Sequence, residues 1–158
     1  MDLALRDLSP QAIGALFEKM FYNSCNRHHI TATRMPDGCR QLGFKKLIRV
    51  KTPWDWILTS GGVTALIDTK TVTGDTFNHS NIKDHQVEEM IRHEIDGAIA
   101  GYVIWVRETD KIFFVQSSHL VDMMRVRGTI KPDDPKAILL GGYSSLNPKL
   151  IWSGHGKA

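Results

Sequence analysis

The stretch of sequence that decides the fold is PWDWILTSGGVTALIDTK, residues 53–70. It contains two runs rich in apolar and β-branched residues, Trp54–Thr59 and Val63–Thr69, on either side of the tripeptide Ser-Gly-Gly at 60–62. Serine and glycine favour turns, whereas β-branched and aromatic residues favour strands. The stretch therefore predicts a β-hairpin.

Three charged residues, Asp55, Asp68 and Lys70, lie at neighbouring ends of this hairpin. Side chains alternate between the two faces of a strand, so Asp68 and Lys70 should share one face, which Asp55 on the adjacent strand can reach. Two carboxylates can hold Mg²⁺, and an ammonium can orient the attacking water or stabilise developing negative charge, as phosphodiester hydrolysis requires. An Asp-x-Lys pattern alone is also common in surface ion pairs. The presence of Asp55 thirteen residues before Asp68, on the adjacent predicted strand, is what favours an active site.

The apolar periodicity on both sides of the hairpin predicts further helices and strands. A helix should begin at Ser9-Pro10, where serine can cap the first turn and proline fits the first helical position, and should end near Arg27. A second helix should begin at Ser80 or Asn81. This order of elements is typical of an α/β domain with a central mixed β-sheet and flanking helices. The remaining predicted elements are strands at His29–Arg34, Tyr102–Val106, Ile112–Val115 and Ala137–Leu140 and a short helix from Ser117 or Ser118 to about Arg125.

Two further residues lie where such an active site would need them. Glu18 follows the apolar Phe17 on the first helix and could extend inward as a third acid. Gln86 lies four residues before Met90 and flanks the apolar stripe of the second helix, where it could bond a water on the metal or the phosphate. A solvated glutamate and a surface glutamine are the alternative interpretations.

The positive charge of the chain is concentrated in one segment. The whole chain carries a net charge of +3, whereas the segment 34–51 has six basic residues and the single acid Asp37, a net +5. A basic segment on an otherwise near-neutral chain indicates a polyanion such as DNA as its partner, and a solvated basic loop is the alternative. Its apolar residues allow a hairpin or a projecting arm. The candidate DNA-binding residues are Arg34, Arg40, Lys45, Lys46, Arg49 and Lys51.

These motifs resemble a known family. Residues 53–55 and 68–70 together match the PD-(D/E)xK nuclease signature. The pattern D-H-Q-x-x-x-M at 84–90 is similar to the helix that follows this signature in RecU-type Holliday junction resolvases, and the two predicted strands between 101 and 115 are similar to the next strands of that family. The resemblance spans about residues 14–145, nearly the whole domain.

The resemblance implies a restriction-endonuclease-like fold. It also implies a homodimeric enzyme that binds four-way DNA junctions and nicks two strands symmetrically, with Mg²⁺ or Mn²⁺ as cofactor. On this resemblance Asp55 and Asp68 would bind the metal and Lys70 would be the catalytic lysine. Glu18 and Gln86 would complete the site, with Glu18 as a further metal ligand.

The projecting stalk of these resolvases corresponds here to a short basic arm at about 37–51. Asp68 stands where RecU proteins usually have glutamate, which the wider signature permits. Two other functions stay open at this point. One is a nuclease of the same superfamily that acts on duplex DNA, as restriction and repair enzymes do. The other is a non-catalytic junction-binding protein that assists recombination.

The bulk properties fit a globular intracellular protein. A chain of 158 residues with 42% hydrophobic residues suits a single nuclease domain over 1–158, with a loose tail expected from about 146. No apolar run approaches the ~20 residues needed to cross a bilayer, and the first residues lack the layout of a signal peptide. We therefore expect a cytoplasmic, nucleoid-associated protein, or one in the host cytoplasm if a phage encodes it. No zinc-ligand spacing, P-loop or serine-hydrolase motif is evident.

Overall fold

The computed structural model describes residues 7–36, 38–42 and 46–155, and the side chains of 37–50 lie outside this description. The helices are α1 (Pro10–Arg27), α2 (Asp84–Ile95) and α3 (Ser117–Val126), with the short 3-10 helices η2 (His79–Asn81) and η3 (Pro148–Trp152). The strands are β1 (Thr31–Arg34), β2 (Gly38–Leu42), β3 (Lys46–Val50), β4 (Trp56–Ser60), β5 (Val63–Val72), β6 (Phe77–Asn78), β7 (Ile99–Val106), β8 (Lys111–Gln116), β9 (Thr129–Ile130) and β10 (Ala137–Gly141).

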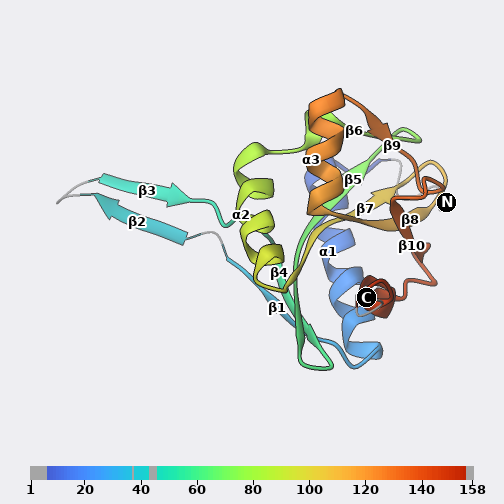
Figure 1. The fold of residues 1–158 in the computed structure, drawn as a ribbon, viewed down its shortest axis with the longest axis horizontal. Coiled ribbons are helices and arrows are strands. Elements are labelled where there is room, and N and C mark those ends of the chain that lie inside the picture. Colours follow the sequence, from blue (N-terminus) through green and yellow to red (C-terminus); the bar gives the residue numbers. More distant parts are fainter. Residues whose placement is uncertain (1–6, 37, 43–45, 156–158) are drawn as a thin grey trace.

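The centre of the fold is a six-stranded sheet in the order β1-β4-β5-β7-β8-β10. Strands β5 and β7 pair in parallel, and the other neighbours in this sheet are antiparallel. Helix α1 packs on one face, and α2 and α3 pack on the other (Figure 1). This arrangement confirms the predicted α/β domain with a central mixed sheet and flanking helices. Within the described ranges, no helix has the length and apolar character needed to span a membrane.

Strand β7 is buried along its whole length because helices cover both of its faces. Val103 and Trp105 join the core under α1, whereas Tyr102 and Ile104 join the core under α2 and α3. Gly101 has no room for a side chain, since a Cβ there would lie 2.1 Å from the carbonyl oxygen of Val115. The nearly all-apolar sequence of this strand follows from this double burial.

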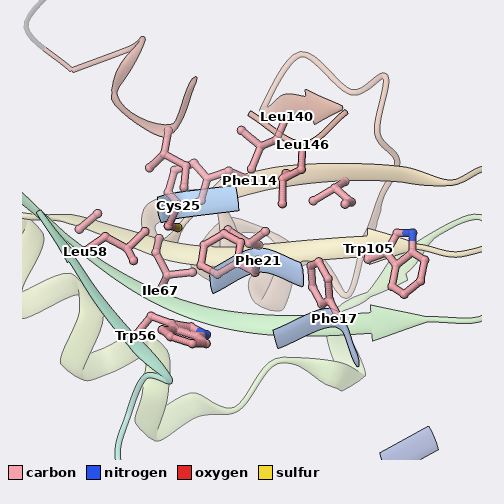
Figure 2. Close-up of a cluster of buried hydrophobic side chains, with 14 of the residues drawn as sticks. Phe17, Phe21, Cys25, Trp56, Leu58, Ile67, Trp105, Phe114, Leu140 and Leu146 are labelled. Atoms are coloured by element: carbon pink, nitrogen blue, oxygen red, sulfur yellow. The ribbon is translucent and has the colours of Figure 1, made fainter. Parts of the chain in front are cut away.

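Aromatic side chains hold α1 on the sheet (Figure 2). The rings of Phe17 and Trp105 have centroids 5.5 Å apart, and those of Phe21 and Trp56 are 5.9 Å apart. Helix α1 begins as predicted, since the Ser9 side chain accepts a hydrogen bond from the Ala12 N–H (3.2 Å). These contacts fix the helix beside the strands that carry the candidate acids.

The predicted hairpin is strands β4 and β5, joined at residues 61–62, where both glycines have positive φ angles. Trp56 pairs with Ile67, so Asp55 and Asp68 come next to one another at the end of the ladder. The Asp55 N–H extends the pairing by donating to the carbonyl oxygen of Ile67 at 3.0 Å. The register therefore brings the two acids together, as the sequence pattern predicts.

Strands β2 and β3 form a separate antiparallel hairpin, from the pair Gly38 and Val50 to the pair Leu42 and Lys46. This hairpin projects from the body of the protein beyond β1 and α2 (Figure 1). The basic segment thus has the form of an arm, which suits contact with a large ligand rather than with the core.

Two predicted features are wrong. Helix α2 begins at Asp84 rather than at Ser80 or Asn81, because those two residues belong to η2, whose first turn is capped by the side chain of Asn78. The tail is not loose between residues 146 and 152. Leu146 and Ile151 are each 2% exposed in the core under α1, and Trp152 donates its ring N–H to the Val63 carbonyl at 3.3 Å.

The packing of η3 predicts a large effect for a substitution near the C-terminal end. Ile151→Ala should lower the free energy of unfolding by about 2–5 kcal/mol, because it leaves a cavity in a closed core. The neighbouring Leu150 is 37% exposed, so Leu150→Ala is the matched control and should cost less than about 1 kcal/mol. Urea unfolding followed by tryptophan fluorescence measures both. Equal effects of the two substitutions would show that this segment adds little to the core.

Candidate active site

Asp55 is fixed at the start of β4 by contacts on three sides. Its backbone carbonyl accepts from the N–H of Met35 at 2.7 Å. Its carboxylate oxygen Oδ2 accepts from the backbone N–H and the hydroxyl of Thr69, both at 3.0 Å. Its other oxygen, Oδ1, lies 3.7 Å from the guanidinium of Arg34. Thr69 of β5 therefore orients the Asp55 carboxylate, and Oδ1 faces the guanidinium of Arg34.

Asp68 lies at the middle of the site and is 2% exposed. Its Oδ2 contacts the ammonium of Lys70, and its Oδ1 accepts from Gln86 Nε2 at 3.3 Å. Burial chiefly raises the pKa of Asp68, the Lys70 ammonium lowers it and the nearby charge of Asp55 raises it, and the net result is a pKa of about 6. A buried acid beside a second acid needs more positive charge than one lysine supplies.

Lys70 connects the acids to the neighbouring strand β7. Its Nζ lies 5.0 Å from the centre of the Tyr102 ring, which offers the negative face of an aromatic system to a cation. The Lys70 side chain stays 21% exposed. It can therefore reach a solvent-side ligand while it remains paired with Asp68.

Gln86 and Tyr102 form a buried polar pair behind Asp68. The Tyr102 hydroxyl donates to Gln86 Oε1 at 2.8 Å and accepts from the backbone N–H of Lys83 at 3.4 Å. Burial, and next the charge of Asp68, raise the pKa of Tyr102 above its usual value, so the hydroxyl keeps its proton. Gln86 therefore lies beside Asp68, and its expected bond to a metal-bound water or to the phosphate stays a prediction.

Glu18 reaches the site through Arg34. The guanidinium of Arg34 donates to both carboxylate oxygens of Glu18, at 3.0 and 3.2 Å. It also lies against Asp55 and over the ring of Trp56, 5.6 Å from the ring centre. Arg34 thus lies between Glu18 and Asp55. The carboxylate of Glu18 pairs with Arg34 rather than with Asp68. The expected roles of Glu18 as a metal ligand and of Arg34 as a DNA contact stay predictions.

The donor set fits a small, hard cation. In the described part of the chain, no three side chains among histidine, cysteine, aspartate and glutamate gather closely enough to hold a metal ion by themselves. Mg²⁺, however, is usually held by one or two carboxylates together with waters and phosphate oxygens of the substrate. Asp55 and Asp68 are such a pair, and the raised pKa of Asp68 indicates that a cation beside it would stabilise its charged form.

The other candidate DNA-binding residues lie on or beside the arm. Lys51 is exposed at its base. Arg40 lies on β2, and Lys46 and Arg49 lie on β3, but their side chains fall outside the described residues, as does all of Lys45. Strands β2 and β3 therefore carry Arg40, Lys46 and Arg49 away from Asp55 and Asp68 (Figure 1), and contact of the candidate residues with DNA stays a prediction.

Three features of the site could not be read from motifs. Thr69, the unassigned residue of the Asp-x-Lys pattern, orients Asp55. The link from Glu18 through Arg34 joins a candidate metal ligand on α1 to a candidate DNA-binding residue on β1. Tyr102 was expected only as a core residue of β7, and the one signal for its polar role is a hydroxyl group in an otherwise apolar strand.

Comparisons with known proteins gave matches that each cover part of the chain. Residues 29–137 match the model of a protein family described as Recombination protein U. A comparison with curated protein sequences gave no significant match. Among solved structures, a similar chain is that of Archaeoglobus fulgidus Hjc, described as a Holliday junction resolvase from an archaeal hyperthermophile. It is 17% identical, the match covers 66% of this chain and 78% of that chain, and the TM-score is 0.48.

The raised pKa of Asp68 predicts a pH dependence of stability. A carboxyl whose pKa is higher in the folded state favours folding when protonated, and this contribution is lost as the pH rises through about 6. Relative to Asp68→Asn, the metal-free wild-type protein should therefore lose about 2 kcal/mol of unfolding free energy between about pH 4 and about pH 7. Urea unfolding in EDTA at several pH values measures this difference. The exposed acid in Asp122→Asn is the control, and parallel curves for wild type and Asp68→Asn would contradict the prediction.

Proposed function

This chain belongs to the Recombination protein U family, whose model matches well over half of its length, and on that premise we propose that it is a Holliday junction resolvase. It would cut four-way DNA junctions by hydrolysing phosphodiester bonds. The observation that carries the proposal is the convergence of Asp55, Asp68 and Lys70 at the end of one hairpin, with Gln86 behind them. Such a group of two carboxylates and an ammonium would suit metal-assisted phosphoryl chemistry, and Asp55 and Lys70 remain partly exposed to a ligand from solvent.

The proposed cofactor is Mg²⁺, with Mn²⁺ as its substitute. Asp55 and Asp68 would hold it, because they supply hard carboxylate oxygens and an excess of negative charge. When bound, such an ion polarises the scissile phosphate, lowers the pKa of water and neutralises developing charge. Glu18 would be a further ligand, and to bind the metal it would have to share its carboxylate oxygens with Arg34 or leave that guanidinium, from which both now accept.

The remaining side chains would orient the reactants. Lys70 would direct the attacking water or stabilise negative charge on the phosphate, because its ammonium is held between Asp68 and the Tyr102 ring yet stays partly exposed. Gln86 would keep the Asp68 carboxylate in one orientation. Arg34 is exposed enough to exchange Glu18 for a DNA phosphate.

The proposed substrate is the four-way junction. The protein would bind it as a homodimer, whose two active sites would make paired, symmetric nicks. Affinity would come mainly from phosphate contacts of the basic arm, and selectivity from the shape of the junction rather than from base sequence. A protein with this substrate would work in the cytoplasm, at the nucleoid.

Cleavage of a synthetic four-way junction tests the function directly. Wild-type protein with Mg²⁺ should nick two opposing strands, whereas Asp68→Asn should cut at least about 1,000-fold more slowly and still bind the junction, because the charge that holds the metal is lost while the phosphate contacts stay. Mapping of nicks on all four strands measures cleavage, and gel mobility measures binding.

The same assay includes two controls. Asp122→Asn, which changes an exposed acid of α3, should cut at the wild-type rate. A linear duplex of the same sequence should be cut much more slowly than the junction. Equal cleavage of duplex and junction would favour the duplex nuclease, and binding without cleavage by wild type would favour the non-catalytic accessory protein. A wild-type rate for Asp68→Asn would overturn the assigned site.

The basic arm predicts a strong salt dependence of junction binding. Replacing Arg40, Lys45, Lys46 and Arg49 together with alanine should reduce the slope of log K against log salt concentration by about 3–4 per protomer, because each lost phosphate contact removes about 0.9. Fluorescence anisotropy with a labelled junction at several salt concentrations measures the slope. Lys149→Ala, far from the arm in the C-terminal η3, is the control. An unchanged slope in the arm variant would show that DNA does not lie along the arm.

A further inference from the structure

The first turn of α2 contains an unusual capping arrangement. The N-cap residue is Lys83, whose side chain makes no capping hydrogen bond, and Gln86 is the third helical residue. In an ordinary capping box, a glutamine at this position accepts a hydrogen bond from the backbone N–H of the N-cap residue. Here the Tyr102 hydroxyl lies between the two groups, since it accepts from the Lys83 N–H and donates to Gln86 Oε1.

This arrangement sets the orientation of the Gln86 amide. The Asp68 carboxylate has no proton to donate, so its Oδ1 accepts from the Gln86 amide nitrogen at 3.3 Å. The amide oxygen then faces the Tyr102 hydroxyl, which donates its one proton to that oxygen at 2.8 Å. The same hydroxyl oxygen accepts from the Lys83 N–H. The Gln86 amide thus has a partner at each end, and the Tyr102 hydroxyl is the partner of its oxygen.

Tyr102 also lies beside the acids in the sheet. It is the parallel partner of Asp68 in the register of β5 and β7, and it is fully buried. Its ring packs edge-on against Phe77, with centroids 6.0 Å apart, and faces the ammonium of Lys70. One side chain thus contacts the start of α2, Gln86 and Lys70 at once.

We infer that Tyr102 is a positioning residue of this site: its hydroxyl diverts Gln86 from the capping box and holds the Gln86 amide against Asp68. The inference rests on the proposed function only for its consequence in catalysis. The orientation of Gln86 is a property of the protein without metal or DNA, and it can be measured there.

The substitution Tyr102→Phe isolates the hydroxyl, because it keeps the ring that packs against Phe77 and Lys70. Without the hydroxyl, Gln86 Oε1 is free to accept directly from the Lys83 N–H, which restores an ordinary capping box and turns the amide nitrogen away from Asp68. The helix keeps its cap, whereas Asp68 loses a partner. We therefore expect a small change in melting temperature together with a marked change at the site.

The first measurement uses the side-chain amide signals of ¹⁵N-labelled, metal-free protein. The signals of Gln86 are those that disappear in Gln86→Leu. They should shift in Tyr102→Phe and also in Asp68→Asn, because both changes remove a partner of the same amide. In Tyr143→Phe, which removes a hydroxyl on the other side of the sheet, they should keep their wild-type positions. Unshifted Gln86 signals in Tyr102→Phe would overturn the inference.

The second measurement is Mn²⁺ binding without DNA, followed by electron paramagnetic resonance, and junction cleavage at saturating substrate. Tyr102→Phe should weaken Mn²⁺ binding by about tenfold and lower kcat with little change in KM, as loss of a partner behind a metal ligand does. The double variant Tyr102→Phe/Gln86→Leu should be no worse than Gln86→Leu alone, because both act through one amide. Multiplied effects would show that the hydroxyl acts independently of Gln86.

The two measurements separate this inference from the proposed function. If wild-type protein neither binds Mn²⁺ nor cuts the junction, the proposed function fails, while the amide signals still decide the orientation of Gln86. If it does both and Tyr102→Phe behaves as wild type in binding and cleavage, the proposed function stands and the positioning role of Tyr102 fails.

Discussion

The buried carboxylate of Asp68 is the constraint on which the rest of the site depends. A charged group with 2% exposure is unfavourable in a protein interior unless other groups compensate its charge and its lost hydrogen bonds to water. Lys70 supplies the charge and Gln86 supplies a hydrogen bond, each from a different element. The chain has to bring β5 and the first turn of α2 to one place in order to bury this acid at all.

The topology of the sheet achieves this meeting. Antiparallel pairing of β4 with β5 sets Asp55 beside Asp68. Parallel pairing of β5 with β7 requires a crossover between them, and α2 is that crossover. A crossover helix packs on the sheet that it connects, so the first turn of α2, which carries Gln86, lies over the strand pair that carries Asp68 and Tyr102. The β4–β5 hairpin thus brings Asp55 and Asp68 together, and the single parallel pair of the central sheet, β5 with β7, places α2 and its Gln86 beside them.

The parts of the site that could be predicted from the sequence are those with a short-range pattern. The apolar and β-branched residues of Val63–Thr69 and the turn at 60–62 predicted the hairpin. The spacing before Met90 predicted that Gln86 flanks the apolar stripe of its helix, and the residue is buried there. Tyr102 could not be assigned, because its polar partners come from α2 and its strand has the sequence of a plain core strand.

Two other errors have a similar physical origin. The ordered structure of residues 146–152 was not predicted, because polar residues and a proline separate Leu146 from Ile151 in the sequence. The 3-10 helix η3 nevertheless brings both side chains into the core under α1. The pairing of Arg34 with Glu18 was missed because the two residues are distant in sequence and each was assigned by its own segment. In each case a long-range contact decided the outcome, and local periodicity carries no information about such contacts.

The two acids of the site have different environments, and this difference bears on the chemistry that we propose. Asp55 is oriented by the backbone N–H and hydroxyl of Thr69 and has a guanidinium nearby, whereas Asp68 is buried and its pKa is raised to about 6. A proton and a divalent cation would therefore compete for Asp68 near pH 6. Each satisfies the same shortage of positive charge, so binding of the cation would release a proton and stabilise the fold. In this way the unfavourable burial of one carboxylate would be converted into affinity for the proposed metal ion.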